Sequence, residues 1–140
     1  LKNYRLLTEG LLELGRVELR VFLELGETVA IGEYAFAGNK TLKNLTLSEK
    51  TKSVASYAFY GCEALKKVNI NAEKIKLGLS VFENCKDLRE IAVNSAVIPS
   101  GSFAGCHKLE KVTIGKDVAV IGEHAFKNTA VKSFEVAEGN

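Results

Sequence analysis

One pattern of side chains recurs along most of the chain at intervals of 21 to 23 residues. Its most regular member is a phenylalanine, with an aliphatic residue five positions earlier and glycine or asparagine two positions later. The phenylalanines are Phe36, Phe59, Phe82, Phe103 and Phe126. Five copies that share one internal order are typical of a solenoid, in which each repeat forms a coil that stacks on the next.

A leucine-rich segment follows each phenylalanine and ends in two apolar residues separated by one other residue. These pairs are Leu45/Leu47, Val68/Ile70, Ile91/Val93, Val112/Ile114 and Phe134/Val136. Alternation with period two is typical of a half-buried strand. Because the repeats are translated copies, we expect one strand per coil, paired in parallel about 4.7–4.9 Å apart, with one face of the sheet exposed.

The other columns of the repeat predict how each coil closes. Glycine or asparagine tolerates positive φ and predicts a sharp corner at Gly38, Gly61, Asn84, Gly105 and Asn128. We expect each phenylalanine to stack on those of the neighbouring coils beside this corner. The aliphatic column is expected to close the third side of the core, and it consists of Ile31, Val54, Leu77, Ile98 and Ile121.

The chain of 140 residues is predicted to form a single domain. Residues 28–136 hold the five repeats, residues 1–27 form a degenerate N-terminal capping coil, and residues 137–140 are a tail. Within the capping coil, alternation from Leu19 to Leu25 predicts a first strand, and the spacing from Tyr4 to Leu14 favours a short helical lid. We also expect an uncapped C-terminal coil with an unpaired edge, which allows end-to-end association. The absence of an initiator Met and of a signal peptide suggests a fragment or a processed product.

Several blocks of the repeat identify a family resemblance. Ile31-Gly-Glu-Tyr-Ala-Phe-Ala-Gly-Asn and Ile121-Gly-Glu-His-Ala-Phe-Lys-Asn, each followed by its leucine strand, resemble the BspA-type leucine-rich repeats. The resemblance covers residues 31–136. It implies a mainly β, right-handed leucine-rich repeat superhelix with a parallel sheet on the concave face and turns or short helical segments elsewhere. It also implies a secreted or surface-attached bacterial protein with roles in adhesion and protein binding.

The third and fourth coils depart from the regular repeat. The third carries Leu77-Gly-Leu-Ser-Val-Phe, and the fourth contains Pro99 and a connection that is two residues shorter. We expect these changes to alter the local curvature and to leave the fold intact.

Composition and motifs indicate a protein that is not an enzyme. The net charge is only +2, and no apolar run approaches the length needed to span a membrane. The two histidines, His107 and His124, lie in different columns, and neither has a nucleophile and an aspartate at a plausible spacing. No phosphate-binding glycine loop or metalloprotease motif is present.

The three cysteines, Cys62, Cys85 and Cys106, occupy one column that holds Asn39 and Thr129 in the outer repeats. Metal ligands usually come in closely spaced pairs, which do not occur here. We therefore expect reduced, buried thiols that act as small core residues, and neither a metal site nor a cofactor.

The exposed positions of the predicted sheet form three rows that hold six basic and three acidic residues. The candidate partner-binding residues on this concave face are Lys43, Lys66, Lys67, Arg89, Lys111 and Lys132. Charged strand faces also serve simply to prevent aggregation. The rows hold no aromatic residue, and the positive excess is small, so nucleic acid is not expected. A host or matrix protein, or an anionic polysaccharide, fits better.

Two functions follow from this surface. The first is a non-enzymatic protein-binding or adhesion module on a secreted or cell-surface protein. The alternative is a structural spacer within a longer polypeptide, with no ligand of its own. A repeat scaffold does not by itself decide between them.

Overall fold

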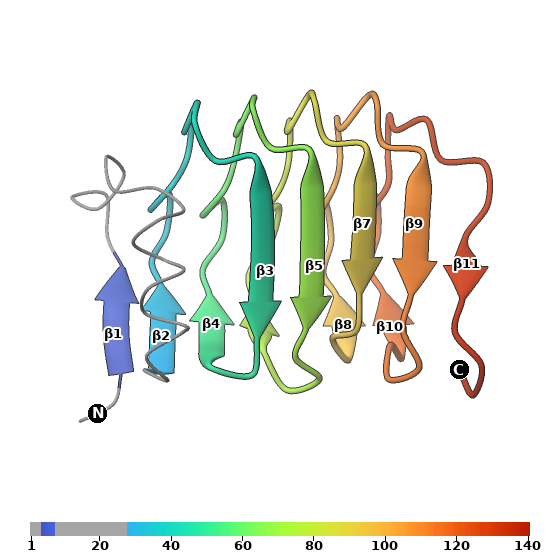
Figure 1. The fold of residues 1–140 in the computed structure, drawn as a ribbon, viewed down its shortest axis with the longest axis horizontal. Coiled ribbons are helices and arrows are strands. Elements are labelled where there is room, and N and C mark those ends of the chain that lie inside the picture. The colour runs from blue at the N-terminus through green and yellow to red at the C-terminus, as the bar shows by residue number, and fades with distance from the viewer. Residues whose placement is uncertain (1–3, 8–27) are drawn as a thin grey trace.

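The computed structural model describes residues 4–7 and 28–140. Short strands stack side by side along one long axis (Figure 1). Strands of one layer run down the front of the molecule, strands of a second layer run up the back, and the chain advances from left to right. This sense of winding is right-handed. The predicted fold class, a right-handed solenoid of parallel strands, is confirmed.

The front layer is a continuous parallel sheet, here called the front sheet, in the order β11-β9-β7-β5-β3. Its strands pair in register, so that Leu45, Val68, Ile91 and Val112 are neighbours across the sheet. Exposed and buried residues alternate along β3 and β5, as the period of two predicts. The strands are β3 (Asn44–Ser48), β5 (Lys67–Asn71), β7 (Glu90–Val93), β9 (Lys111–Ile114) and β11 (Glu135–Val136).

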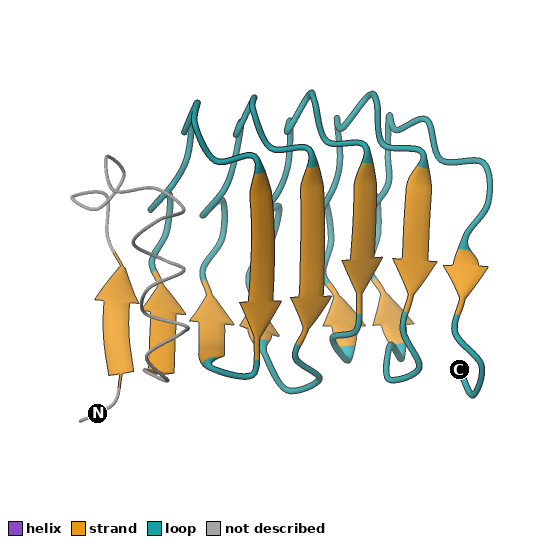
Figure 2. Cartoon of the chain, viewed as in Figure 1, coloured by secondary structure: helices purple, strands orange, loops and turns teal. Residues whose placement is uncertain are grey.

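The aliphatic column forms a second ladder of parallel strands at the back. Its strands are β1 (Tyr4–Leu7), β2 (Thr28–Ile31), β4 (Thr51–Val54), β6 (Lys76–Leu77), β8 (Val97–Ile98) and β10 (Val120–Ile121). Turns connect the two layers, and the described residues contain no helix (Figure 2). The structure thus adds a second ladder where the sequence predicted turns or short helical segments.

The second ladder is interrupted between β6 and β8. In regular coils, the residue that follows the aliphatic residue donates its N–H to the backbone carbonyl of the aliphatic residue in the previous coil. Gly78 donates to Val54 and Gly122 to Ile98, both at 2.7 Å. Pro99 holds this position in the fourth coil and has no N–H, so the carbonyl of Leu77 receives no such bond. Ile98 is nevertheless buried, so the core passes through the interruption.

Two serine hydroxyls bind carbonyls on either side of Ile98 in the fourth coil. Ser95 donates to the carbonyl of Val97 at 2.9 Å, and Ser102 donates to the carbonyl of Pro99 at 2.6 Å. Both serines are buried. The Ser95 hydroxyl thus binds a carbonyl that faces the interruption, whereas the Ser102 hydroxyl adds to the bond that Pro99 already accepts from the N–H of Ser102 at 3.2 Å.

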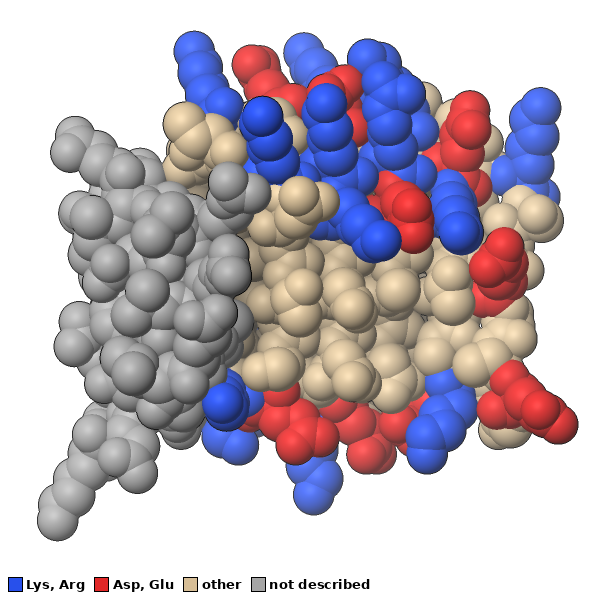
Figure 3. Space-filling model, viewed as in Figure 1, with Lys and Arg blue, Asp and Glu red and all other residues tan. Residues whose placement is uncertain are grey.

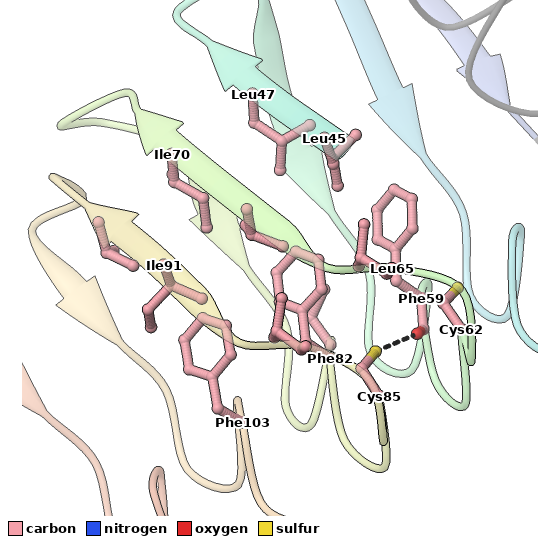
Figure 4. Packing of buried hydrophobic residues seen from close by; sticks show 14 of the residues in the cluster. Leu45, Leu47, Phe59, Cys62, Leu65, Ile70, Phe82, Cys85, Ile91 and Phe103 are labelled. Atoms are coloured by element: carbon pink, nitrogen blue, oxygen red, sulfur yellow. Dashed lines mark hydrogen bonds between the residues drawn. The ribbon is translucent and has the colours of Figure 1, made fainter. Parts of the chain in front are cut away.

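The phenylalanine column forms a continuous aromatic stack inside the solenoid. Ring centroids of successive phenylalanines lie 5.2, 5.3, 5.3 and 5.6 Å apart, with interplanar angles of 4°, 12°, 2° and 11°. Leucines and isoleucines of the front sheet point toward these rings (Figure 4). The predicted stacking is therefore confirmed, and the first four rings are buried, whereas Phe126 is only partly buried.

Each corner has two positions with positive φ. The first is the predicted glycine and asparagine column, where φ lies between 58° and 76°. The second was not predicted, and its members are Tyr34, Tyr57, Ser80, Gly101 and His124. The tyrosine, serine and histidine in this column adopt φ values of 53° to 61°, which side chains with a Cβ rarely accept.

The N-terminal prediction is wrong in one part. Tyr4–Leu7 is strand β1, paired in parallel with β2, and not the beginning of a helical lid. The register places Leu7 beside Ile31, so this segment extends the aliphatic ladder by one strand. Backbone hydrogen bonds to β2 stabilise the strand more than the helical spacing of a few leucines favours a helix. The strand predicted from Leu19 to Leu25 and the rest of the capping coil lie outside the described residues.

Candidate binding surface on the front sheet

Lysine and arginine side chains gather along the upper edge of the front sheet, where its strands begin (Figure 3). Acidic side chains lie between them, and a broad area without charge lies below. The backbone places the first basic row: Lys66 donates its N–H to the carbonyl of Lys43 at 2.8 Å, and Arg89 donates to Lys66 at 3.0 Å. Consecutive coils therefore bring Lys43, Lys66 and Arg89 side by side, as predicted.

Glu90 divides the second basic row. It lies in register between Lys67 and Lys111. Its Oε2 is 3.6 Å from Nζ of Lys67 and 3.9 Å from Nζ of Lys111. All three side chains are partly exposed, so these pairs contribute little to stability, but they lower the positive potential of the row.

Asp87 lies beside the end of the first row. Its Oδ1 accepts a hydrogen bond from Nζ of Lys108 at 3.0 Å and is 3.9 Å from a guanidinium nitrogen of Arg89. The hydrogen bond from Lys108, helped by the positive charges of Lys108, Arg89 and Lys66, lowers the pKa of Asp87 below its ordinary value. Asp87 therefore remains ionised at neutral pH and offsets part of the charge of Arg89. Sequence reasoning missed this residue because it lies in the loop before the strand.

Within the described part of the chain, Lys43 and Lys66 make no ion pair. Both side chains are exposed, so no carboxylate of the described residues neutralises either ammonium group. Lys132 also has no ion pair among the described residues, but it lies two coils beyond Arg89 and does not join this cluster. The predicted site thus consists of a central group, Lys43, Lys66, Lys67 and Arg89, with Lys111 beside it through Glu90.

Uncharged residues occupy the middle of the front sheet. Thr46, Asn69, Ala92 and Thr113 pair in register across four strands. The small side chain of Ala92 leaves a shallow hollow of about 150 Å³, lined by residues that include Asn69, Asn94 and Thr113. The hollow lies directly below the basic edge. The small, uncharged residues in the third row of exposed positions indicate this hollow in the sequence, but only the charged residues were predicted to bind a partner.

The cysteines hold the coils together through their thiols. Cys62, Cys85 and Cys106 each donate S–H to the phenylalanine carbonyl of the previous coil, at 3.1, 3.2 and 3.2 Å. All three are free and buried. The neighbouring thiols of Cys106 and Cys62, together with burial, raise the pKa of Cys85 well above its ordinary value. A neutral, inaccessible thiol is a poor nucleophile, so the column has a structural role.

The histidines do not assemble into a site with these residues. His124 lies in the positive-φ column of the last coil, and His107 follows the buried Cys106 with its own side chain exposed. Among residues 4–7 and 28–140, no three His, Cys, Asp or Glu side chains are arranged to hold a metal ion. The same residues include no helix long and apolar enough to cross a membrane.

A comparison with protein-family models matches residues 23–139 to the BspA type leucine rich repeat region, in six copies. The chain belongs to the BspA-type leucine-rich repeat family. The match covers the five predicted repeats and begins within the degenerate first coil. A search of curated proteins found no match.

Solved structures of bacterial leucine-rich repeat proteins share the fold. One from Bacteroides ovatus has 30% sequence identity and a TM-score of 0.69, and the alignment covers 71% of this chain and 26% of that chain. Another, from Eubacterium ventriosum, has 18% identity and a TM-score of 0.56, with 74% of this chain and 41% of that chain covered. The chain therefore spans about a quarter of the Bacteroides ovatus protein.

Proposed function

We propose that this BspA-type leucine-rich repeat chain is a non-enzymatic binding module that takes a protein partner on its front sheet. The observation that supports this most is the arrangement of the front sheet. Lys43 and Lys66, which make no ion pair with the described residues, stand in one row at the beginning of its strands, and the strands that follow carry an uncharged hollow at Ala92. A charged rim around a smoother, uncharged centre suits a protein surface. An adhesion role at a bacterial cell surface, or in a secreted protein, agrees with the family.

The mixed signs of the rim favour a protein over an anionic polysaccharide. Glu90 and Asp87 lie within 4 Å of the basic groups and would repel a continuous polyanion. A protein can place its own cations against these carboxylates and its acids against Lys43 and Lys66. The alternation of basic and acidic groups therefore selects a partner by the positions of its charges as well as by their sign.

The proposal is tested with two matched triple variants. Lys66→Ala, Lys67→Ala and Arg89→Ala remove three charges from the front sheet. Lys52→Ala, Lys74→Ala and Lys76→Ala remove three exposed charges from outside this sheet. Binding of each variant and of the parent protein to individually immobilised matrix and serum proteins, and to a sulfated polysaccharide, is measured at low and high salt.

We expect salt-sensitive binding to at least one protein, strongly weakened by the front-sheet variant and unchanged by the control. Equal binding by both variants would contradict the proposed surface. Binding to the polysaccharide alone would show that the partner is a polyanion. If the parent protein binds nothing in the panel, the structural-spacer function becomes the better interpretation.

A further inference from the structure

Two tyrosines of the second positive-φ column form a short stack on the corner that follows each strand of the second ladder (Figure 1). The ring centroids of Tyr34 and Tyr57 lie 5.2 Å apart, with an interplanar angle of 8°. The ring of Tyr60 meets that of Tyr57 edge-on, with centroids 5.8 Å apart and an interplanar angle of 65°. Nδ2 of Asn84 donates a hydrogen bond to the hydroxyl of Tyr60 at 2.9 Å. Contacts on two sides therefore hold the ring of Tyr57 in place without a ligand.

The stack stops at Tyr57, because the column continues with Ser80 and Gly101. Backbone bonds place these residues in consecutive coils: Tyr57 donates its N–H to the carbonyl of Leu79, and Ser80 donates to that of Ser100, both at 3.1 Å. In the phenylalanine stack one coil holds one ring, at spacings of 5.2 to 5.6 Å. The two small residues therefore leave two ring positions of the column unfilled beside Tyr57. We call this site, formed by Tyr57, Ser80 and Gly101, the tyrosine notch.

Hydrogen-bonding groups lie in the tyrosine notch and beside it. Oγ of Ser80 makes no hydrogen bond with the described residues. It lies over Gly101, where an added Cβ would be 2.5 Å away from it. Glu83 belongs to the same turn, because its N–H donates to the carbonyl of Ser80 at 3.2 Å, and its carboxylate makes no ion pair among residues 4–7 and 28–140. The notch thus combines an aromatic wall with an available hydroxyl and a nearby carboxylate.

A carbohydrate matches this combination better than the aromatic side chain of a protein does. A pyranose ring has a C–H face that packs on a tyrosine ring, and it has hydroxyl groups that bond to Ser80 and Glu83. An aromatic side chain would cover the Ser80 hydroxyl without bonding to it, which costs free energy. Residues 55–61, 78–84 and 99–105, which form the corner here, include one acidic residue and no basic residue. This charge disfavours an anionic sugar.

We propose that the tyrosine notch binds a neutral carbohydrate chain. One pyranose ring lies above Ser80 with its C–H face against Tyr57, and the next ring of the chain lies above Gly101. Hydroxyl groups of the first ring bond to Oγ of Ser80 and to the carboxylate of Glu83. This site lies on the corner and not on the front sheet, and it does not depend on the function proposed there.

The test titrates the 140-residue chain with neutral trisaccharides, namely the β-linked trimers of glucose, mannose, galactose and N-acetylglucosamine. The ring resonances of Tyr57 and the amide resonance of Ser80 are followed by NMR. We expect at least one trisaccharide to shift both, with a Kd of about 1 mM or tighter. N-acetyltyrosinamide, titrated in parallel, represents the aromatic side chain of a protein partner.

Ser80→Tyr is the most informative variant, because it fills the notch with the residue that the column holds in the first two coils. The φ of Ser80 is 53°, close to the 57° of Tyr34 and the 61° of Tyr57, so the backbone accepts a tyrosine. We expect this variant to have a Tm at least equal to that of the parent protein and to bind the sugar about tenfold or more weakly. Lys74→Tyr adds the same ring at an exposed position between β5 and β6, in the opposite turn of the third coil, and should leave binding unchanged.

Ser80→Ala keeps the notch and removes only the hydroxyl, so it keeps the test valid if the larger substitution disturbs the corner. We expect it to weaken sugar binding by about threefold or more. Unchanged binding by either Ser80 variant would overturn the proposal. Absence of any shift with all four trisaccharides at about 10 mM, or shifts with N-acetyltyrosinamide alone, would overturn it as well.

Discussion

The front sheet and the second ladder are built by the same repeats, yet only the front sheet is continuous. Five strands pair without a break at the front, whereas the ladder at the back stops between β6 and β8. The aliphatic side chain is present on both sides of the interruption, since Leu77 packs partly buried against the core and Ile98 is fully buried. The difference is one backbone N–H, which Pro99 lacks. Core packing and ladder bonding are therefore separable in this solenoid, and each can be perturbed by itself.

The largest effect should come from the core that both layers share. Phe82→Ala removes a ring stacked between Phe59 and Phe103, and the cavity cannot collapse between two fixed coils. We expect a loss of about 3–5 kcal/mol in the free energy of unfolding. Phe126→Ala should cost only about 1–2 kcal/mol, because that ring is partly exposed. Denaturant unfolding measures both, and equal losses would contradict the assignment of the stack.

The second ladder alone should respond to Gly78→Ala. A Cβ at this position would collide with the backbone nitrogen of Ser56 in the previous coil. We expect destabilisation by about 1–3 kcal/mol, since backbone cannot move aside as a flexible side chain can. A variant as stable as the parent protein in thermal or denaturant unfolding would show that the coils do not approach this closely.

Ser95→Ala tests how the interruption is compensated. The substitution removes the hydroxyl that binds the carbonyl of Val97 and leaves that carbonyl with one bond fewer. We expect a cost of about 1 kcal/mol in the free energy of unfolding. Ser100→Ala, at an exposed position on the other side of β8, provides the control and should be nearly neutral. If both serine variants lose the same stability, the compensating role of Ser95 is wrong.

The smallest effect is expected at the solvent side of the front sheet. Thr46 is exposed on β3 between buried Leu45 and Leu47. Thr46→Ala should change the free energy of unfolding by no more than about 0.5 kcal/mol. A loss as large as that of Phe82→Ala would mean that the strand is turned the other way.

Side-chain periodicity predicted most of the fold because it reports directly on burial. The alternation of Leu45 and Leu47 and the recurrence of phenylalanine each have one structural explanation, and the structure bears it out. The second positive-φ column could not be predicted in the same way. Tyr34 and Tyr57 are not residue types that signal a left-handed backbone, and only the closure of the coil imposes it on them.

The candidate site was predictable in part for a related reason. Strand register follows from the repeat, so the neighbours Lys43, Lys66 and Arg89 could be placed beforehand. Asp87 lies in a loop, and its hydrogen bond with Lys108 depends on side-chain geometry that the repeat pattern does not predict. The interruption at Pro99 was not predictable either, because the missing N–H has an effect only where a second ladder exists, and the sequence did not predict that ladder.

The most direct test of this account is residue-resolved amide hydrogen exchange of the native protein. Val54 and Leu77 hold the same position in successive coils, and the carbonyl of Val54 is bound by Gly78 of the next coil. Since the N–H and carbonyl of one strand residue face the same neighbour, the amide of Val54 lies in the ladder, and that of Leu77 faces the interruption. We predict much faster exchange at Leu77 than at Val54, with uniformly slow exchange at the paired positions of β5 and β7. Equal protection of Val54 and Leu77, or a matching break in the front sheet, would contradict it.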